Sequence, residues 1–186
     1  MSGTIWLIVE DENDGSVVQI ILKKRGIPVV VKILKPSGGA GGISRLAKQL
    51  RLLIEAAKKQ KKATDCIAVL HDYDIHSQQQ NRQPYQQIEQ ICKAEMVKHV
   101  VAHDELESWM LSDSGLCEWL EIQTRNWDEQ RKPSDELRRM LQDKKKMKYQ
   151  GADREKVFAK LNGDGDKFSP SMRDALEHLK DAPCVL

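Results

Sequence analysis

Ala68-Val-Leu-His-Asp-Tyr-Asp-Ile-His76 is a stretch in which an apolar run leads directly into ionisable side chains. The apolar residues 67–70 are typical of a strand that is buried on both faces. Asp72 and Asp74 follow at once, and two carboxylates so close together raise each other's pKa unless a cation neutralises them. Carboxylate oxygens suit Mg²⁺ or Mn²⁺. On these residues alone, a polar turn in which Asp72 caps the next element is an equally good interpretation.

The chain has 186 residues, 40% of them hydrophobic, which suits one domain or one domain with a helical extension. The formal net charge of +2 does not by itself indicate a nucleic-acid-binding protein. The four cysteines form no CxxC motif, which favours reduced thiols and a cytoplasmic location over a zinc knuckle or a disulfide framework. The apolar run near the N-terminus is too short for a signal peptide or a membrane span.

Strand and helix patterns alternate over the first part of the chain. Apolar runs predict strands at 5–9, 29–34, 67–70 and 97–102. Segments whose apolar residues have helical spacing lie between these runs. We therefore expect an α/β fold with a mostly parallel four-stranded sheet flanked by helices. The strand signal ends after residue 122, so the predicted domains are an α/β domain at 1–122 and a helical C-terminal extension at 123–186.

Three of the predicted strands end in acidic side chains. These are Glu10 after the first strand, Asp72 and Asp74 after the third, and Asp104, Glu105 and Glu107 after the fourth. Because the carboxyl ends of parallel strands meet at one edge of a sheet, we expect these acids to lie close together. All but Asp104 are candidate ligands of a divalent metal, with one or both of Glu105 and Glu107 facing the site. Asp14 and Asp104 are interpreted as helix caps.

Histidines lie beside the same predicted edge. Three of them are candidates to contact the metal ligands and hold them in position, without binding the metal: His71, His76 and His103. In a weaker alternative they bind zinc or manganese themselves.

A glycine-rich loop at 36–42 leads into a long basic helix. Gly39 and Gly41 would let a phosphate approach the backbone, and Arg45 and Lys48 would add positive charge for substrate binding. A plain loop that needs positive φ explains the glycines at least as well, and a solvated helix face is the commoner explanation of the lysines.

The residues at two strand ends resemble the Toprim domain of topoisomerases, bacterial primases and nucleases: Ile-Val-Glu10 and His-Asp72-Tyr-Asp74. Within that group the chain is most similar to a small bacterial Toprim-like family with two further motifs. These read here Ala102-His-Asp-Glu-Leu-Glu-Ser-Trp-Met-Leu-Ser-Asp113 and Ser169-Pro-Ser-Met-Arg173. The chain departs from the wider Toprim pattern after Glu10, where aspartate replaces a common glycine, and after Asp74.

The resemblance implies a parallel sheet between helices and Mg²⁺ or Mn²⁺ held by Glu10, Asp72 and Asp74 for phosphodiester cleavage. Glu10 would be a metal ligand or general base, and Glu105 or Glu107 would complete the site. The implied function is a metal-dependent phosphodiester hydrolase, a nuclease in DNA processing or phage defence that works beside an ATPase partner. Two alternatives stay open: a non-catalytic binding module of this fold, and a small-molecule phosphatase.

Overall fold

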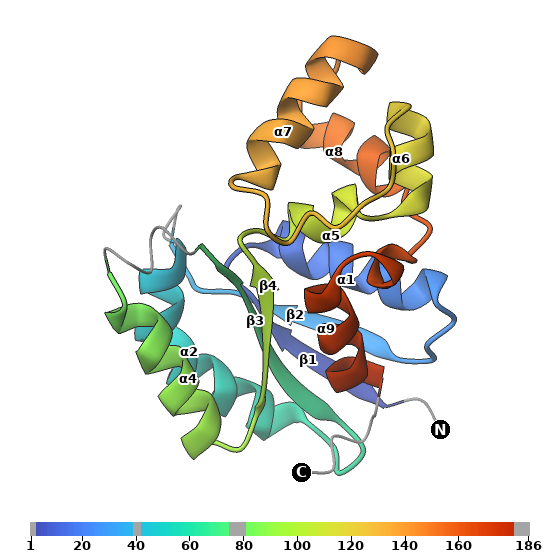
Figure 1. Ribbon diagram of the computed structural model, residues 1–186. Helices are drawn as coiled ribbons and strands as arrows, with labels where there is room; N and C mark the ends of the chain where they lie inside the picture. Colours follow the sequence, from blue (N-terminus) through green and yellow to red (C-terminus); the bar gives the residue numbers. More distant parts are fainter. Residues whose placement is uncertain (1–2, 39–41, 75–80, 181–186) are drawn as a thin grey trace.

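The computed structural model describes residues 3–38, 42–74 and 81–180. It has an α/β fold in which helices flank a four-stranded sheet whose strand pairs are all parallel (Figure 1). The strands are β1 (Thr4–Ile8), β2 (Val30–Leu34), β3 (Cys66–Tyr73) and β4 (Lys98–His103), in the order β2-β1-β3-β4. The expected fold class is confirmed.

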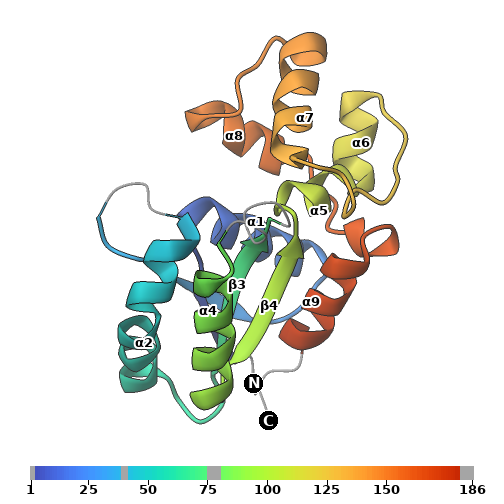
Figure 2. The same cartoon turned by 60° about the vertical axis from the view of Figure 1, so that its left-hand side comes forward.

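The two central strands, β1 and β3, pair with Ile8 opposite Val69. Alternate residues of β1 enter different apolar layers, because successive side chains of a strand point to opposite faces: Leu7 packs on one face and Ile8 on the other. Helices α1 (Glu12–Lys24) and α9 (Pro170–Lys180) cover the first face, and α2 (Gly42–Gln60) and α4 (Gln83–Ala94) cover the second (Figures 1 and 2).

Strand β3 is longer than its apolar run predicts. It continues through Tyr73 because β4 pairs with it to the end, with Asp72 opposite Ala102 and Tyr73 opposite His103. Asp72 is therefore a strand residue, and the interpretation of residues 71–73 as a polar turn is wrong.

Helix α1 begins earlier than its apolar spacing suggests. Asp11 is the N-cap and accepts a hydrogen bond from the amide of Asn13 at 2.8 Å. The Asp14 carboxylate accepts one from the amide of Asp11 at 3.3 Å, which completes a capping box. The capping box places the first turn of α1 directly after Glu10, at the carboxyl end of β1.

The described residues after 122 form helices and no strand, as expected. The helical elements that follow β4 are α5 (Glu107–Leu111), α6 (Ser114–Leu120), α7 (Pro133–Met140) with a π-helical turn (Leu141–Lys145), α8 (Gly151–Phe158), a 3₁₀ turn (Gly165–Lys167) and α9. Helix α9 returns to the sheet and packs along β4 (Figure 1). Residues from both predicted domains thus share one apolar core.

Helices long and apolar enough to cross a membrane are absent from the part of the chain that the structure describes. Cys92 and Cys117 are buried free thiols, as expected.

Candidate functional site

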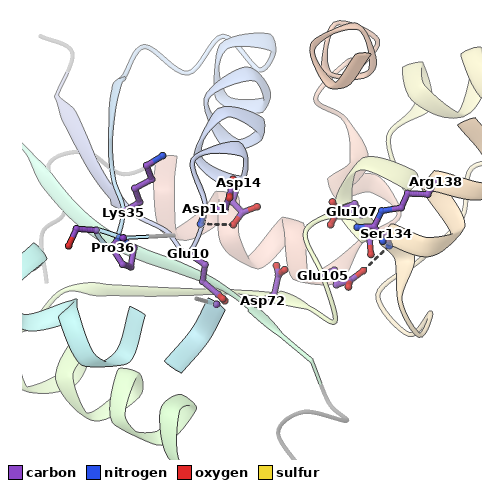
Figure 3. Close-up of a pocket in the computed structure, with 13 residues that line it drawn as sticks. Glu10, Asp11, Asp14, Lys35, Pro36, Asp72, Glu105, Glu107, Ser134 and Arg138 are labelled. Carbon is purple, nitrogen blue, oxygen red and sulfur yellow. Dashed lines mark hydrogen bonds between the residues drawn. The ribbon is translucent and has the colours of Figure 1, made fainter. Parts of the chain in front are cut away.

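A cavity of about 690 Å³ opens at the carboxyl ends of β1 and β3 (Figure 3). Among the described residues, six acids line it: Glu10, Asp11, Asp14, Asp72, Glu105 and Glu107. Two cations, Lys35 and Arg138, line it as well. Figure 3 shows that the acids come from two sides: Glu10, Asp14 and Asp72 from the strand ends and α1, and Glu105 and Glu107 from just before and at the start of α5, beside α7.

The central strands bring Glu10 and Asp72 to the cavity. Glu10 follows β1, and one of its carboxylate oxygens lies 3.6 Å from where a Cβ on Gly42 would be, at the first turn of α2. Asp72 lies near the end of β3, and its carboxylate accepts a hydrogen bond from the amide of Leu106 at 2.9 Å. Because β1 and β3 are neighbours in the sheet, the two acids reach the same cavity from adjacent strands.

Glu105 and Glu107 both line the cavity, although they lie two residues apart in the sequence. Glu105 accepts a hydrogen bond from the amide of Ser134 at 2.7 Å and so ties the first turn of α7 to the site. The hydroxyl of Tyr149, a residue that follows α7 in the chain, lies near Glu107 and lowers the pKa of that carboxyl in part, although burial raises it more. The two glutamates therefore join the helical extension to the cavity.

The fold disfavours the charged form of four of these acids. Burial raises the pKa of Glu10 to about 7, although a hydrogen bond from the backbone of Asp72 lowers it in part. Burial and then the charges of Glu107 and Glu10 raise the pKa of Asp14 to about 8. Burial, followed by the nearby carboxylates, also raises the pKa values of Asp72 and Glu107. Groups of carboxylates with raised pKa values are typical of catalytic and metal sites.

Within the described ranges, no group of three or more histidine, cysteine, aspartate or glutamate side chains lies close enough together to hold a metal ion. The donor set nevertheless suits Mg²⁺ or Mn²⁺, because the acids that line the cavity supply carboxylate oxygens. Mg²⁺ keeps several of its waters and needs only one or two carboxylates from a protein. Glu10 and Asp72, on adjacent strands, can supply these two.

Asp74, a predicted metal ligand, does not line the cavity. Its charge instead lies near Tyr85 of α4, where burial and then the charges of Glu10 and Asp74 raise the tyrosine's pKa to about 12. Asp72 and Asp74 are therefore not brought together at one cavity, although they are two residues apart.

His71 faces away from the cavity. Its ring packs 5.7 Å from that of Tyr85, on the face that α4 covers. Nδ1 lies 2.8 Å from the carbonyl oxygen of Asp72, and Nε2 lies 2.8 Å from Nε2 of His99. Burial lowers the pKa of His71 to about 4, so the ring is neutral near pH 7. His71 thus supports the backbone that carries Asp72.

The other predicted residues have different positions. His103 is exposed at the end of β4, and its ring centroid is 6.4 Å from that of Tyr73. Arg45 and Lys48 lie in the first turns of α2, outside the cavity lining, and Lys48 is exposed. Gly39, Gly41 and His76 lie outside the described residues. The flanking Gly38 and Gly42 line the cavity.

Sequence reasoning missed Asp14, Lys35, Arg138 and Tyr149. From the sequence, Asp14 is interpreted only as a helix cap. Its position in the first turn of α1, four residues after Glu10, nevertheless indicates that it lies at the same edge of the sheet. Lys35 directly follows β2, the neighbour of β1, so it also leaves the sheet at this edge. Arg138 and Tyr149 gave no local signal, because only the packing of the C-terminal helices brings them here.

Comparisons with known proteins identify no relative of this chain. No protein-family model matches the chain, no curated protein matches it, and no solved structure matches it.

Proposed function

We propose that this protein is a divalent-metal-dependent phosphodiester hydrolase that acts on nucleic acid in the cytoplasm. The observation that carries the proposal is the pair of half-buried acids at the ends of adjacent central strands, Glu10 and Asp72, with Asp14 and Glu107 in the same cavity. Burying so many carboxylates together is costly unless they bind a cation. The resemblance to Toprim domains supports the same assignment for Glu10 and Asp72.

Glu10 and Asp72 would hold Mg²⁺ or Mn²⁺, with Asp14 and Glu107 beside them. The metal would lower the pKa of a bound water and neutralise charge on the phosphoryl group. Asp14, in the first turn of α1 and in the same cavity, would be the carboxylate that accepts and returns a proton. Lys35 and Arg138 at the cavity lining would hold phosphate oxygens, because within the described residues each forms an ion pair only with an exposed acid and can exchange it.

DNA as the substrate and an ATPase as the partner are part of the proposal through the Toprim resemblance. Exposed lysines on α2, such as Lys48 and Lys59, offer charge for a nucleic-acid backbone. Arg51 and Lys58 are less available, because both pair with Glu95 at the end of α4.

A non-catalytic binding module of the same fold is the second candidate. The observation in its favour is that the described side chains form no ready group of three metal ligands. Such a module would bind nucleic acid or a partner protein at this edge without hydrolysis.

The test compares the wild type with Asp72→Asn, incubated with plasmid or single-stranded DNA and Mn²⁺. We expect metal-dependent cleavage that falls about a hundredfold or more in the variant, because a carboxylate that holds the metal is lost. Glu55→Gln, an exposed acid on the far side of α2 from the core, is the matched control and should cleave normally. Mn²⁺ should also raise the thermal midpoint of the wild type and not that of Asp72→Asn.

Two results would separate the candidates. DNA binding without cleavage, under every metal tried, would favour the binding module. Cleavage that Asp72→Asn retains in full would contradict the assignment of the site.

A further inference from the structure

A second groove, of about 570 Å³, adjoins the acidic cavity between α1 and α8. Asp11 and Lys35 line both spaces, so the two are continuous. A smaller cavity of about 110 Å³ extends from Asp14 and Glu107 to Arg154 on α8. Arg154 lines the groove and this smaller cavity, and therefore lies where the groove meets the acidic site.

Arg154 is held in place but lacks an acceptor. Its guanidinium lies 4.7 Å from the ring centroid of Tyr149, whose hydroxyl donates a hydrogen bond to the sulfur of Met110 at 3.4 Å. Its Nε is buried and has no hydrogen-bond partner among residues 3–38, 42–74 and 81–180. None of the ion pairs within the described ranges includes it. A buried charged donor in a native protein is normally paired, so an acceptor that fits this position is expected.

The groove favours a phosphate as that acceptor. The planar fork of an arginine matches the oxygens of a phosphate, and stacking on Tyr149 fixes its orientation in advance. Lys35 lies at the boundary of the two spaces. In the part of the chain that the structure describes, it forms an ion pair only with the largely exposed Glu12, a weak contact that a phosphate can replace. Of the other acids of the groove, Asp11 accepts the amide of Asn13 and Glu155 is exposed to solvent.

We propose that Arg154 and Lys35 form a subsite for a phosphate that flanks the one at the acidic cavity. The substrate class is then a polynucleotide strand rather than a small phosphoester, since a second phosphate must reach the groove. This inference rests on the proposed function, which it extends to the adjoining groove.

The experiment measures the fluorescence anisotropy of a labelled single-stranded oligodeoxynucleotide with Ca²⁺ in place of Mn²⁺. Arg154→Gln should weaken binding by about tenfold or more, because a charge-assisted hydrogen bond is lost. The slope of log Kd against log salt should fall by about 0.7 for the lost phosphate contact. Lys156→Gln removes a charge from the exposed face of the same helix and should change Kd less than about twofold.

Arg154→Lys keeps the charge without the Nε donor and should bind with intermediate affinity. It also guards against a folding defect in Arg154→Gln, which the thermal midpoint would reveal. The inference is overturned if the wild type does not bind the oligonucleotide. It is equally overturned if the folded Arg154→Gln and Arg154→Lys both bind like the wild type.

Cleavage assays with Mn²⁺ keep the inference and the proposed function apart. If Arg154→Gln loses binding while no protein cleaves DNA or bis(p-nitrophenyl) phosphate, the subsite stands and the hydrolase proposal fails. If both proteins cleave the small diester equally and the variant only raises KM for the oligonucleotide, both proposals stand.

Discussion

Asp72 combines three features that seldom occur together in one acid: it lies in a central strand, it is half-buried, and other carboxylates lie near it. The amide of Leu106 donates to its carboxylate, and His71 contacts its backbone oxygen from the opposite face. These contacts fix its position without neutralising its charge. A residue held in this way is suited to hold a cation.

At the scale of single residues, the raised pKa values of Glu10 and Asp14 predict how stability depends on pH. Both are carboxyls whose folded pKa values, about 7 and about 8, exceed their ordinary values of 4.5 and 3.8. The folded state therefore binds more protons than the unfolded state between these limits. The stability that this provides is complete below about pH 4 and is lost as pH rises through 7 to 8.

Urea unfolding of the protein in EDTA checks this expectation. The free energy of unfolding should fall by on the order of a few kcal/mol between pH 5 and pH 8. Asp14→Asn should reduce the slope, because asparagine does not titrate, and Mn²⁺ should restore stability at pH 8. A wild type whose stability is constant across this range without metal would contradict the raised pKa values.

At the scale of elements, the two sequence motifs of the C-terminal half, residues 102–113 and 169–173, contact each other. Trp109 of α5 donates from Nε1 to the hydroxyl of Ser171 in α9 at 2.7 Å. The buried carboxylate of Asp128 accepts from Ser169 and from the amide of Ser171, at 2.7 and 2.8 Å. These residues thus hold α9 against the core, and only Glu105 and Glu107 of the two sequence motifs line the acidic cavity.

Asp113, at the start of α6, is the clearest structural acid of the chain. Its buried carboxylate accepts hydrogen bonds from the amides of Gly115, Leu116, Asn162, Gly163 and Asp164. Asp113→Ala removes an N-cap and leaves several amides unpaired, so the free energy of unfolding should fall by about 3 kcal/mol or more. Urea unfolding at pH 7 measures this loss.

Glu118→Ala, an exposed position on the same helix, is the control and should stay within about 0.5 kcal/mol of the wild type. If Asp113→Ala is no less stable than this control, the carboxylate does not organise the turn between α8 and α9.

At the scale of the whole molecule, one apolar core joins the sheet to the C-terminal helices. It contains Leu7 and Ala102 of the sheet together with Leu137 of α7 and Leu176 of α9. Because this core crosses residue 122, we expect residues 3–180 to unfold as one cooperative unit.

Differential scanning calorimetry tests the cooperativity. A single transition whose calorimetric enthalpy equals the van 't Hoff enthalpy is expected, and Asp128→Ala should shift the whole transition to lower temperature. Two separate transitions, of which Asp128→Ala moves only one, would show that the extension beyond residue 122 folds independently.

The sequence alone allows the prediction of the sheet and of most of its edge chemistry. Strand and helix signals are local, because burial and backbone geometry repeat every two residues or every 3.6 residues. Acids at or just beyond the carboxyl end of a strand share the position of that strand in the sheet. Glu10 and Asp72 are therefore predicted at one edge of the sheet, and both line one cavity. Glu105 and Glu107 follow from the same rule.

Only the tertiary structure decided which other residues belong to the site. The order β2-β1-β3-β4 makes Glu10 and Asp72 neighbours, and pairing with β4 extends β3, after which Asp74 lies near Tyr85 instead. Packing of the C-terminal helices adds Arg138 and brings Arg154 to the adjoining groove. These placements depend on contacts between segments that are distant in the chain. The free energy of such contacts favours this packing over others, and a local sequence pattern does not predict it.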